Sequence, residues 1–66
     1  MSHAMEDIGG QLIAYEQGEL DEEGAIALFS RLIITGLAWT LQGSYGRQAM
    51  RFIESGVLSR TGEILV

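Results

Sequence analysis

The sequence contains no cysteine, no proline and no lysine, and its one histidine is His3. The absence of cysteine excludes disulfide bonds and thiolate metal sites. No apolar run approaches the roughly 18 residues that a membrane-spanning helix needs, and no charged start precedes an apolar stretch as in a secretory signal. We therefore expect a cytoplasmic protein that does not enter a membrane.

The chain is short, with 66 residues, and 47% of them are hydrophobic. A domain of this size buries only about 60% of its unfolded surface, so it depends on efficient helix packing or on a partner subunit. Residues 1–4 are typical of a cloning remnant ahead of a native start at Met5. We predict one helical domain over residues 5–58, a C-terminal tail over residues 59–66, and self-association into a homo-oligomer.

The charges are divided unevenly along the chain. Residues 1–23 carry seven carboxylates and no arginine, whereas residues 24–66 carry four arginines and two glutamates, so the net charge of -5 is the sum of -7 and +2. Such a chain can pair head to tail with itself or with a partner of mixed charge. It matches poorly the basic footprint of a nucleic-acid-binding protein.

Apolar spacing of three and four residues predicts three helices punctuated by glycines. The first helix is expected over residues 5–17, with Gly18 at the position that follows a helix end. The predicted buried stripe of this helix consists of Met5, Ile8, Leu12, Ile13 and Tyr15.

The second predicted helix begins after Asp21, a residue that caps helix N-termini well. It is apolar over more than half its circumference, which is typical of a helix packed between others or in an interface. Its apolar residues are Ala25, Ile26, Leu28, Phe29, Leu32, Ile33 and Leu37. Gly36 either ends this helix, with a further turn after it, or lies within it.

The third helix is predicted from an N-cap at Ser44 to about Ser55, with Gly56 as its stop. Its expected buried stripe is Tyr45, Ala49, Phe52 and Ile53, with Met50 beside it. Residues 59–66 have no helical period, so they form a short strand, a docked tail or a disordered end. The fold class predicted is a small all-α, three-helix fold.

Aromatic residues, glycines and arginine are concentrated in residues 37–49. Three residues of this segment, together with an arginine just after it, are candidates for contact with a protein partner. Binding hot spots are dominated by tryptophan, tyrosine and arginine, which are the residue types of Trp39, Tyr45 and the two arginines. Arg47 and Arg51 lie four residues apart on one helix face. The alternative for Trp39 and Tyr45 is that they fill the core of a small bundle. The alternative for the arginines is a solvated face, or pairing with the acidic half of the same or a neighbouring chain.

No catalytic constellation is present. The acidic group from Glu19 to Glu23 lacks the ligand order of a calcium loop, and acids at a helix start are stabilised by the helix dipole. No nucleophile–histidine set or phosphate loop occurs, so we predict no enzyme activity, no cofactor and no metal site. A helix-turn-helix that exposes Arg47, Gln48, Arg51 and Glu54 on its second helix and regulates through nucleic acid is an alternative. A structural homo-oligomer of the virion is another.

Two motifs stand out in the chain, the L-A-W-T-L-Q-G-S-Y-G-R run over residues 37–47 and the I-E-S-G run over residues 53–56. With them, about residues 8–58 resemble a family of short tailed-phage proteins, and the first motif is the most specific part of the resemblance. The resemblance implies a phage-encoded protein expressed inside a bacterial host cell. Together, these observations lead us to expect a non-enzymatic protein-binding module that modulates or inhibits a host or defence protein.

Overall fold

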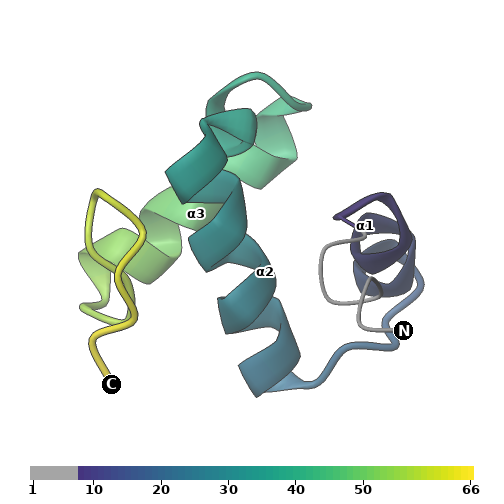
Figure 1. Cartoon of the computed structure of the whole chain (residues 1–66), viewed down its shortest axis with the longest axis horizontal. Coiled ribbons are helices and arrows are strands. Elements are labelled where there is room, and N and C mark those ends of the chain that lie inside the picture. The colour runs from purple at the N-terminus through teal and green to yellow at the C-terminus, as the bar shows by residue number, and fades with distance from the viewer. Residues whose placement is uncertain (1–7) are drawn as a thin grey trace.

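The computed structural model describes residues 8–66, which form three helices around one small core (Figure 1). The helices are α1 (Ile8–Glu16), α2 (Glu22–Thr35) and α3 (Gly43–Glu54), and a short 3-10 helix, η2 (Leu37–Trp39), follows α2. α2 runs through the middle of the molecule, with α1 on one side and the C-terminal segment on the other. The predicted all-α, three-helix fold is confirmed. The expected cloning remnant and the start at Met5 lie outside the described residues.

α1 ends where the sequence predicts. The backbone N–H groups of Gly18 and Glu19 donate to the carbonyls of Tyr15 and Ala14, at 3.1 and 2.8 Å, which closes the helix with Gly18 at a φ of 75°. Of the predicted stripe, Ile8, Leu12 and Tyr15 are partly buried against the core, and Met5 lies outside the described residues. Ile13 is 57% exposed, because it lies roughly 100° around the helix from Leu12 and leaves the face that packs on the core.

α2 begins where predicted and ends at Gly36, one of the two possibilities left open by the sequence. The Asp21 side chain accepts a hydrogen bond from the Gly24 N–H at 2.8 Å, and Gly36 ends the helix with a φ of 83°. Gly36 is therefore a helix end, and the further turn expected after it is η2. None of the helices in residues 8–66 has the length and hydropathy required to cross a membrane.

α3 begins one residue before the predicted cap. Gln42 occupies the N-cap position, without a side-chain hydrogen bond, so the prediction of a cap at Ser44 is wrong. Ser44 already lies in the first turn, where its side chain cannot cap the helix from outside. The predicted buried stripe is confirmed, since Tyr45 and Ala49 are buried and the remaining two members, Phe52 and Ile53, are partly buried against the core.

The C-terminal segment folds back onto α2. A single antiparallel bridge joins Leu58 to Ile64, and the Ser30 hydroxyl donates a hydrogen bond to the Gly62 carbonyl at 2.5 Å. Leu58 is 1% exposed and belongs to the core. Of the three possibilities for residues 59–66, the structure has the docked tail, and the described residues contain no longer strand pairing.

Aromatic rings hold the three helices together. The Phe29 ring of α2 lies 5.2 Å from that of Tyr15, 6.1 Å from that of Tyr45 and 5.4 Å from that of Phe52, measured between ring centroids. Phe29 thus contacts α1 and both ends of the buried face of α3. The fully enclosed core around Phe29 is small. Its members are Leu28, Phe29, Leu32, Ile33, Ala38, Tyr45, Ala49 and Leu58.

Candidate functional site

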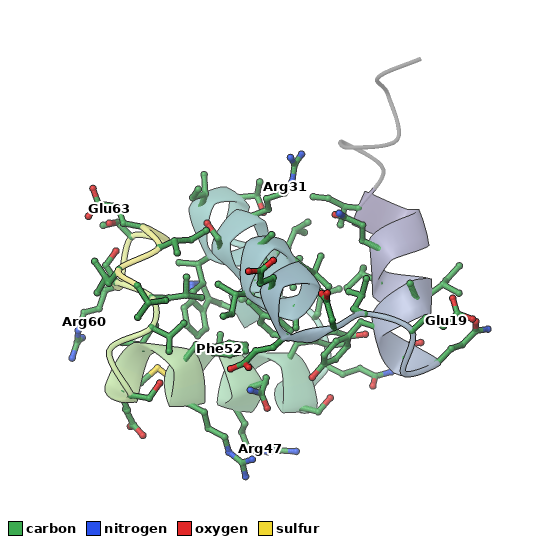
Figure 2. The ribbon with its side chains drawn as sticks, turned by 90° about the horizontal axis from the view of Figure 1, so that it is seen from below. Glu19, Arg31, Arg47, Phe52, Arg60 and Glu63 are labelled. Atoms are coloured by element: carbon green, nitrogen blue, oxygen red, sulfur yellow. The ribbon has the colours of Figure 1, made fainter. Side chains whose placement is uncertain are left out.

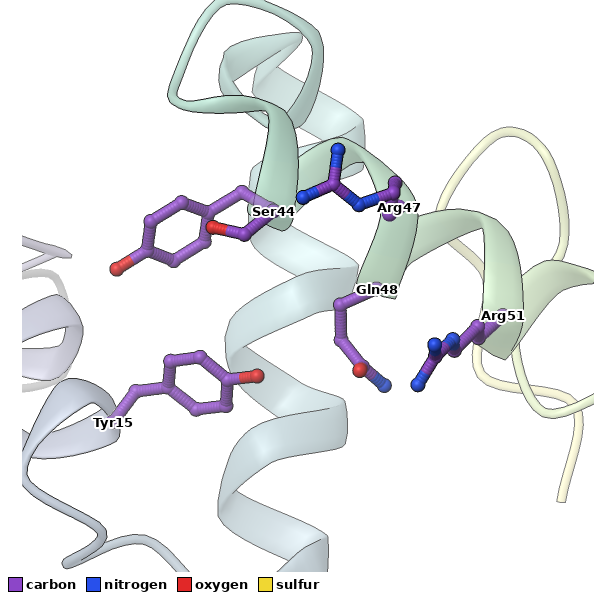
Figure 3. A pocket seen from close by; sticks show the side chains of 6 residues that line it. Tyr15, Ser44, Arg47, Gln48 and Arg51 are labelled. Carbon is purple, nitrogen blue, oxygen red and sulfur yellow. The ribbon is translucent and has the colours of Figure 1, made fainter.

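A polar hollow of about 270 Å³ lies between α1 and α3 (Figure 3). Its lining residues are Tyr15, Ser44, Tyr45, Arg47, Gln48 and Arg51, and we refer to it as the arginine hollow. No carboxylate lines it. This hollow brings together three of the four predicted contact residues.

The helical repeat of α3 explains this side of the hollow. Ser44, Arg47, Gln48 and Arg51 are spaced by three and four residues, so their side chains share one face. Tyr15 comes from the last turns of α1, where its ring is held against Phe29. Figure 3 shows the Tyr15 hydroxyl, the Gln48 amide and the Arg51 guanidinium directed toward a common space.

Tyr45 connects the hollow to the core. Its ring is 6% exposed, which confirms the core interpretation, and its hydroxyl donates a hydrogen bond to Oε2 of Glu16 at 2.5 Å. Burial, followed by the hydrogen bond to Glu16, raises the pKa of Tyr45 from 10.0 to about 12. The neutral phenol is therefore the stable form, and it fixes the end of α1 against α3.

Arg47 and Arg51 are exposed and form no ion pair or hydrogen bond with any of residues 8–66. Pairing with the acidic half of the chain, one of the sequence-based possibilities, is therefore not realised within the described part of a single chain. Figure 2 shows Arg47 projecting from α3 away from the rest of the molecule, while Arg31 and Arg60 project elsewhere. The guanidinium groups beside the hollow are free to bind an external acceptor.

Trp39 lies on another flank of α3. It is 49% exposed, so the interpretation of Trp39 as a core residue is wrong, and its neighbour Ala38 occupies the core instead. A Cβ atom at Gly46 would lie 3.9 Å from Cε3 of Trp39, which places the indole beside Gly46. Gly46 and Arg51 are roughly 140° apart around the helix, so Trp39 and the arginine hollow border the exposed face of α3 from opposite sides.

Three residues of the hollow were not predicted as partner contacts. Gln48 was named only for the helix-turn-helix alternative and Ser44 only as a cap, although both share the three- and four-residue spacing of the arginines. Tyr15 carried no such signal, because its place in the apolar stripe of α1 indicated only a core role. Among residues 8–66, no group of acidic or histidine side chains is arranged to hold a metal ion.

The chain belongs to the family described as domain of unknown function DUF7417, whose model matches residues 1–66. No curated protein and no solved structure matches the chain. The family description carries no activity, so the function has to be argued from the surface of α3.

Proposed function

We propose that this protein is a non-enzymatic protein-binding module that contacts its partner through the exposed face of α3. Trp39 forms one edge of the proposed contact surface, and Arg47 and Arg51 form the other. In this proposal the protein is phage-encoded and acts inside a bacterial cell by occupying a surface of a host or defence protein. Tyr45 contributes by positioning α3 and not by direct contact.

The exposure of Trp39 is the observation that carries the proposal. A small domain gains most stability by burying its largest apolar side chains, yet this chain buries Ala38 and leaves its single tryptophan 49% exposed. An exposed tryptophan and arginines at the two edges of one face match the composition of binding hot spots, where an aromatic anchor is desolvated and charged groups select the partner. Met50, one helical turn beyond Gly46, adds exposed apolar surface to the same flank.

The two arginines indicate which chemical groups the partner surface presents. The two guanidiniums lie one turn apart and have no acidic neighbour on the hollow's wall. A partner that presents acceptor oxygens in this position gains charge-assisted hydrogen bonds without displacing an existing ion pair. We therefore expect an acidic or acceptor-rich edge on the partner surface.

Affinity capture from a bacterial lysate tests the proposal, with Trp39→Ala and the double variant Arg47→Ala/Arg51→Ala compared with the wild type. The expected result is a captured protein that both variants lose and that Arg60→Ala, an exposed arginine on the C-terminal segment, retains. Circular dichroism checks that the variants remain helical. Equal capture by all four proteins would exclude this face, and unfolding of the double variant would show that the arginine pair is structural.

Self-association is a second candidate, favoured by the apolar side chains outside the core. Ile34 is 65% exposed, and the C-terminal residues Ile64, Leu65 and Val66 are 50%, 55% and 82% exposed. A shallow groove of about 360 Å³ also lies among Glu23, Ile26, Ile64 and Val66. A structural homo-oligomer would cover such surfaces.

The helix-turn-helix alternative rests on the outward position of Arg47 and Arg51 on α3. Residues 36–42, including η2, connect α2 to α3, whereas helix-turn-helix proteins use a turn of about 3–4 residues. A labelled DNA duplex at low salt tests this alternative, because phosphate contacts strengthen as salt falls. The absence of a shift under those conditions would remove it.

A further inference from the structure

We propose that the arginine hollow is a binding site for a phosphate monoester, a small organic group carrying one phosphate dianion. This inference goes beyond the proposed protein-binding function and does not depend on it. It rests on the donors, the charge and the walls of the hollow.

The hollow is rich in unused hydrogen-bond donors. Arg47 and Arg51 supply guanidinium N–H groups, Gln48 an amide, and Ser44 and Tyr15 hydroxyls. Within residues 8–66 none of these five side chains donates a hydrogen bond to another group. The three terminal oxygens of a phosphate accept several hydrogen bonds each, so this ligand can engage donors from both α1 and α3.

The charge of the hollow favours a dianion over a carboxylate. Two guanidiniums line it and no acid does, and the Glu16 carboxylate lies behind Tyr45, from whose hydroxyl it accepts a hydrogen bond. A phosphate monoester carries a charge of about −1.5 to −2 at neutral pH, which balances both arginines. A single carboxylate would leave one guanidinium without a counter-charge.

The first turn of α3 adds to this preference. The hollow includes Ser44 in that turn, and Nη1 of Arg47 lies 3.2 Å from the position that a Cβ atom would take at Gly43. The Arg47 guanidinium thus lies beside the helix start, where free backbone N–H groups and the helix dipole also favour an anion. Glycine at position 43 leaves the space that this arrangement needs.

The walls define the organic part of the ligand. Tyr15 and Tyr45 both line the hollow, and their ring centroids are 5.9 Å apart. The volume of about 270 Å³ lies just below that of sites for drug-sized molecules, so it suits a phosphate with one small substituent. An aromatic or other flat group packs best against the partly exposed Tyr15 ring, because Tyr45 behind it is only 6% exposed.

Titration of the full chain with phenyl phosphate, followed by backbone amide NMR shifts, tests the site. We expect saturable binding, with shifts at Ser44 and Gln48, and affinity about tenfold higher than for benzoate of the same ring size. Arg47→Gln and Arg51→Gln should each weaken binding about tenfold, whereas Arg60→Gln should leave it unchanged. Inorganic phosphate should bind more weakly than phenyl phosphate, since it lacks the ring.

Three results would overturn the proposal: no saturable binding, benzoate binding as tight as that of phenyl phosphate, or equal losses for Arg51→Gln and Arg60→Gln. Inorganic phosphate binding as tightly as the ester would reject the organic part of the ligand. If an arginine variant loses its helical spectrum, Gln48→Ala removes a donor of the hollow and provides the same comparison. The effect of Trp39→Ala on protein capture is measured in a separate experiment. The phosphate site and the protein-binding function can therefore fail independently.

Discussion

Tyr45 illustrates how one residue joins two helices and a site. Its ring is packed against Phe29, and its hydroxyl donates to a carboxylate at the end of α1. Burial first, and then Glu16, raises its pKa to about 12. The chain has no lysine, so no lysine side chain releases a proton in the range between pH 10 and pH 12, where Tyr45 does.

The raised pKa of Tyr45 predicts loss of stability at high pH. Because the unfolded chain releases this proton near pH 10 and the folded chain retains it to about 12, the stabilisation is complete below pH 10 and is lost as the pH rises toward 12. The loss is about 2–3 kcal/mol in the free energy of unfolding. Urea denaturation from pH 8 to pH 12 measures it.

Tyr45→Phe is the variant that isolates this effect. It should cost about 1 kcal/mol at pH 8 through the lost hydrogen bond, and its stability should decline less between pH 10 and pH 12. Tyr15→Phe, which keeps the Tyr45 hydroxyl, should retain the wild-type decline. A decline of equal size in Tyr45→Phe would rule out Tyr45 as its source.

Gly62 is constrained twice, by its backbone and by its surroundings. Its φ is 97°, and a Cβ atom there would lie 2.6 Å from Cγ1 of Ile34 and 2.9 Å from the Ser30 carbonyl. Gly62→Ala should therefore destabilise the fold by about 2–4 kcal/mol in urea denaturation. Gly18→Ala is the matched control, because Gly18 has a φ of 75° with nothing within 4 Å, and it should cost only about 1–2 kcal/mol. Equal losses would mean that the contact with α2 is unimportant.

At the scale of elements, local signals account for most of the helix ends. Gly18, Asp21 and Gly56 each end or begin a helix as predicted, because caps depend on residues close in sequence, and Gly36 takes the first of the two roles left open for it. The start of α3 was misplaced, since serine at position 44 is a better cap by type than the glutamine that occupies the position. The residue type at one position does not decide where α3 begins, because the start of the helix is set by burial of its apolar stripe.

The start of α2 gives a prediction at this scale. Asp21→Ala removes the side-chain acceptor of the Gly24 N–H and should lower the free energy of unfolding by about 0.5–2 kcal/mol. Asp21→Asn, which keeps a capping oxygen, should lose less. Thermal unfolding followed by circular dichroism compares the two, and similar losses would indicate that the charge near the helix dipole matters more than the cap.

Contacts between elements that are distant in sequence could not be predicted from the sequence patterns. The docked tail depends on the hydrogen bond between Ser30 and Gly62, and the arginine hollow depends on the approach of α1 to α3. The arginine pair on one face of α3 was predictable from spacing, but the wall supplied by Tyr15 was not. Trp39 was ambiguous for a similar reason, because η2 sets which of Ala38 and Trp39 turns inward.

For the whole molecule, a small core makes each buried side chain important. Leu32 is fully buried, so Leu32→Ala should cost about 2–5 kcal/mol, which is comparable to the total stability of a small domain. Ile34→Ala, at a site 65% exposed two residues away, should change stability by about 0.5 kcal/mol or less. Urea denaturation measures both, and a similar cost for the two would contradict the burial pattern.

The exposed apolar surface leads to the last prediction, which concerns assembly. A domain with 47% hydrophobic residues leaves Ile13, Ile34, Ile64, Leu65 and Val66 at least half exposed, and water-exposed apolar area of this kind is stabilised by association. We expect light scattering to give a molar mass that rises with concentration from 7.2 kDa to that of a dimer or larger species. Ile34→Asp and Ile64→Asp should reduce this mass if α2 and the C-terminal segment form the contact, whereas Ile13→Asp on α1 should not.

The two outcomes lead to different searches for function. A stable dimer that these aspartate variants dissociate would mean that self-association covers the apolar side chains, and function would then be sought on the charged residues at its edge. A constant mass of 7.2 kDa at every concentration would contradict the prediction and leave the apolar surface for another protein. In that case, the flank around Trp39 becomes the first surface to mutate, because it combines an exposed aromatic ring with the arginine face of α3.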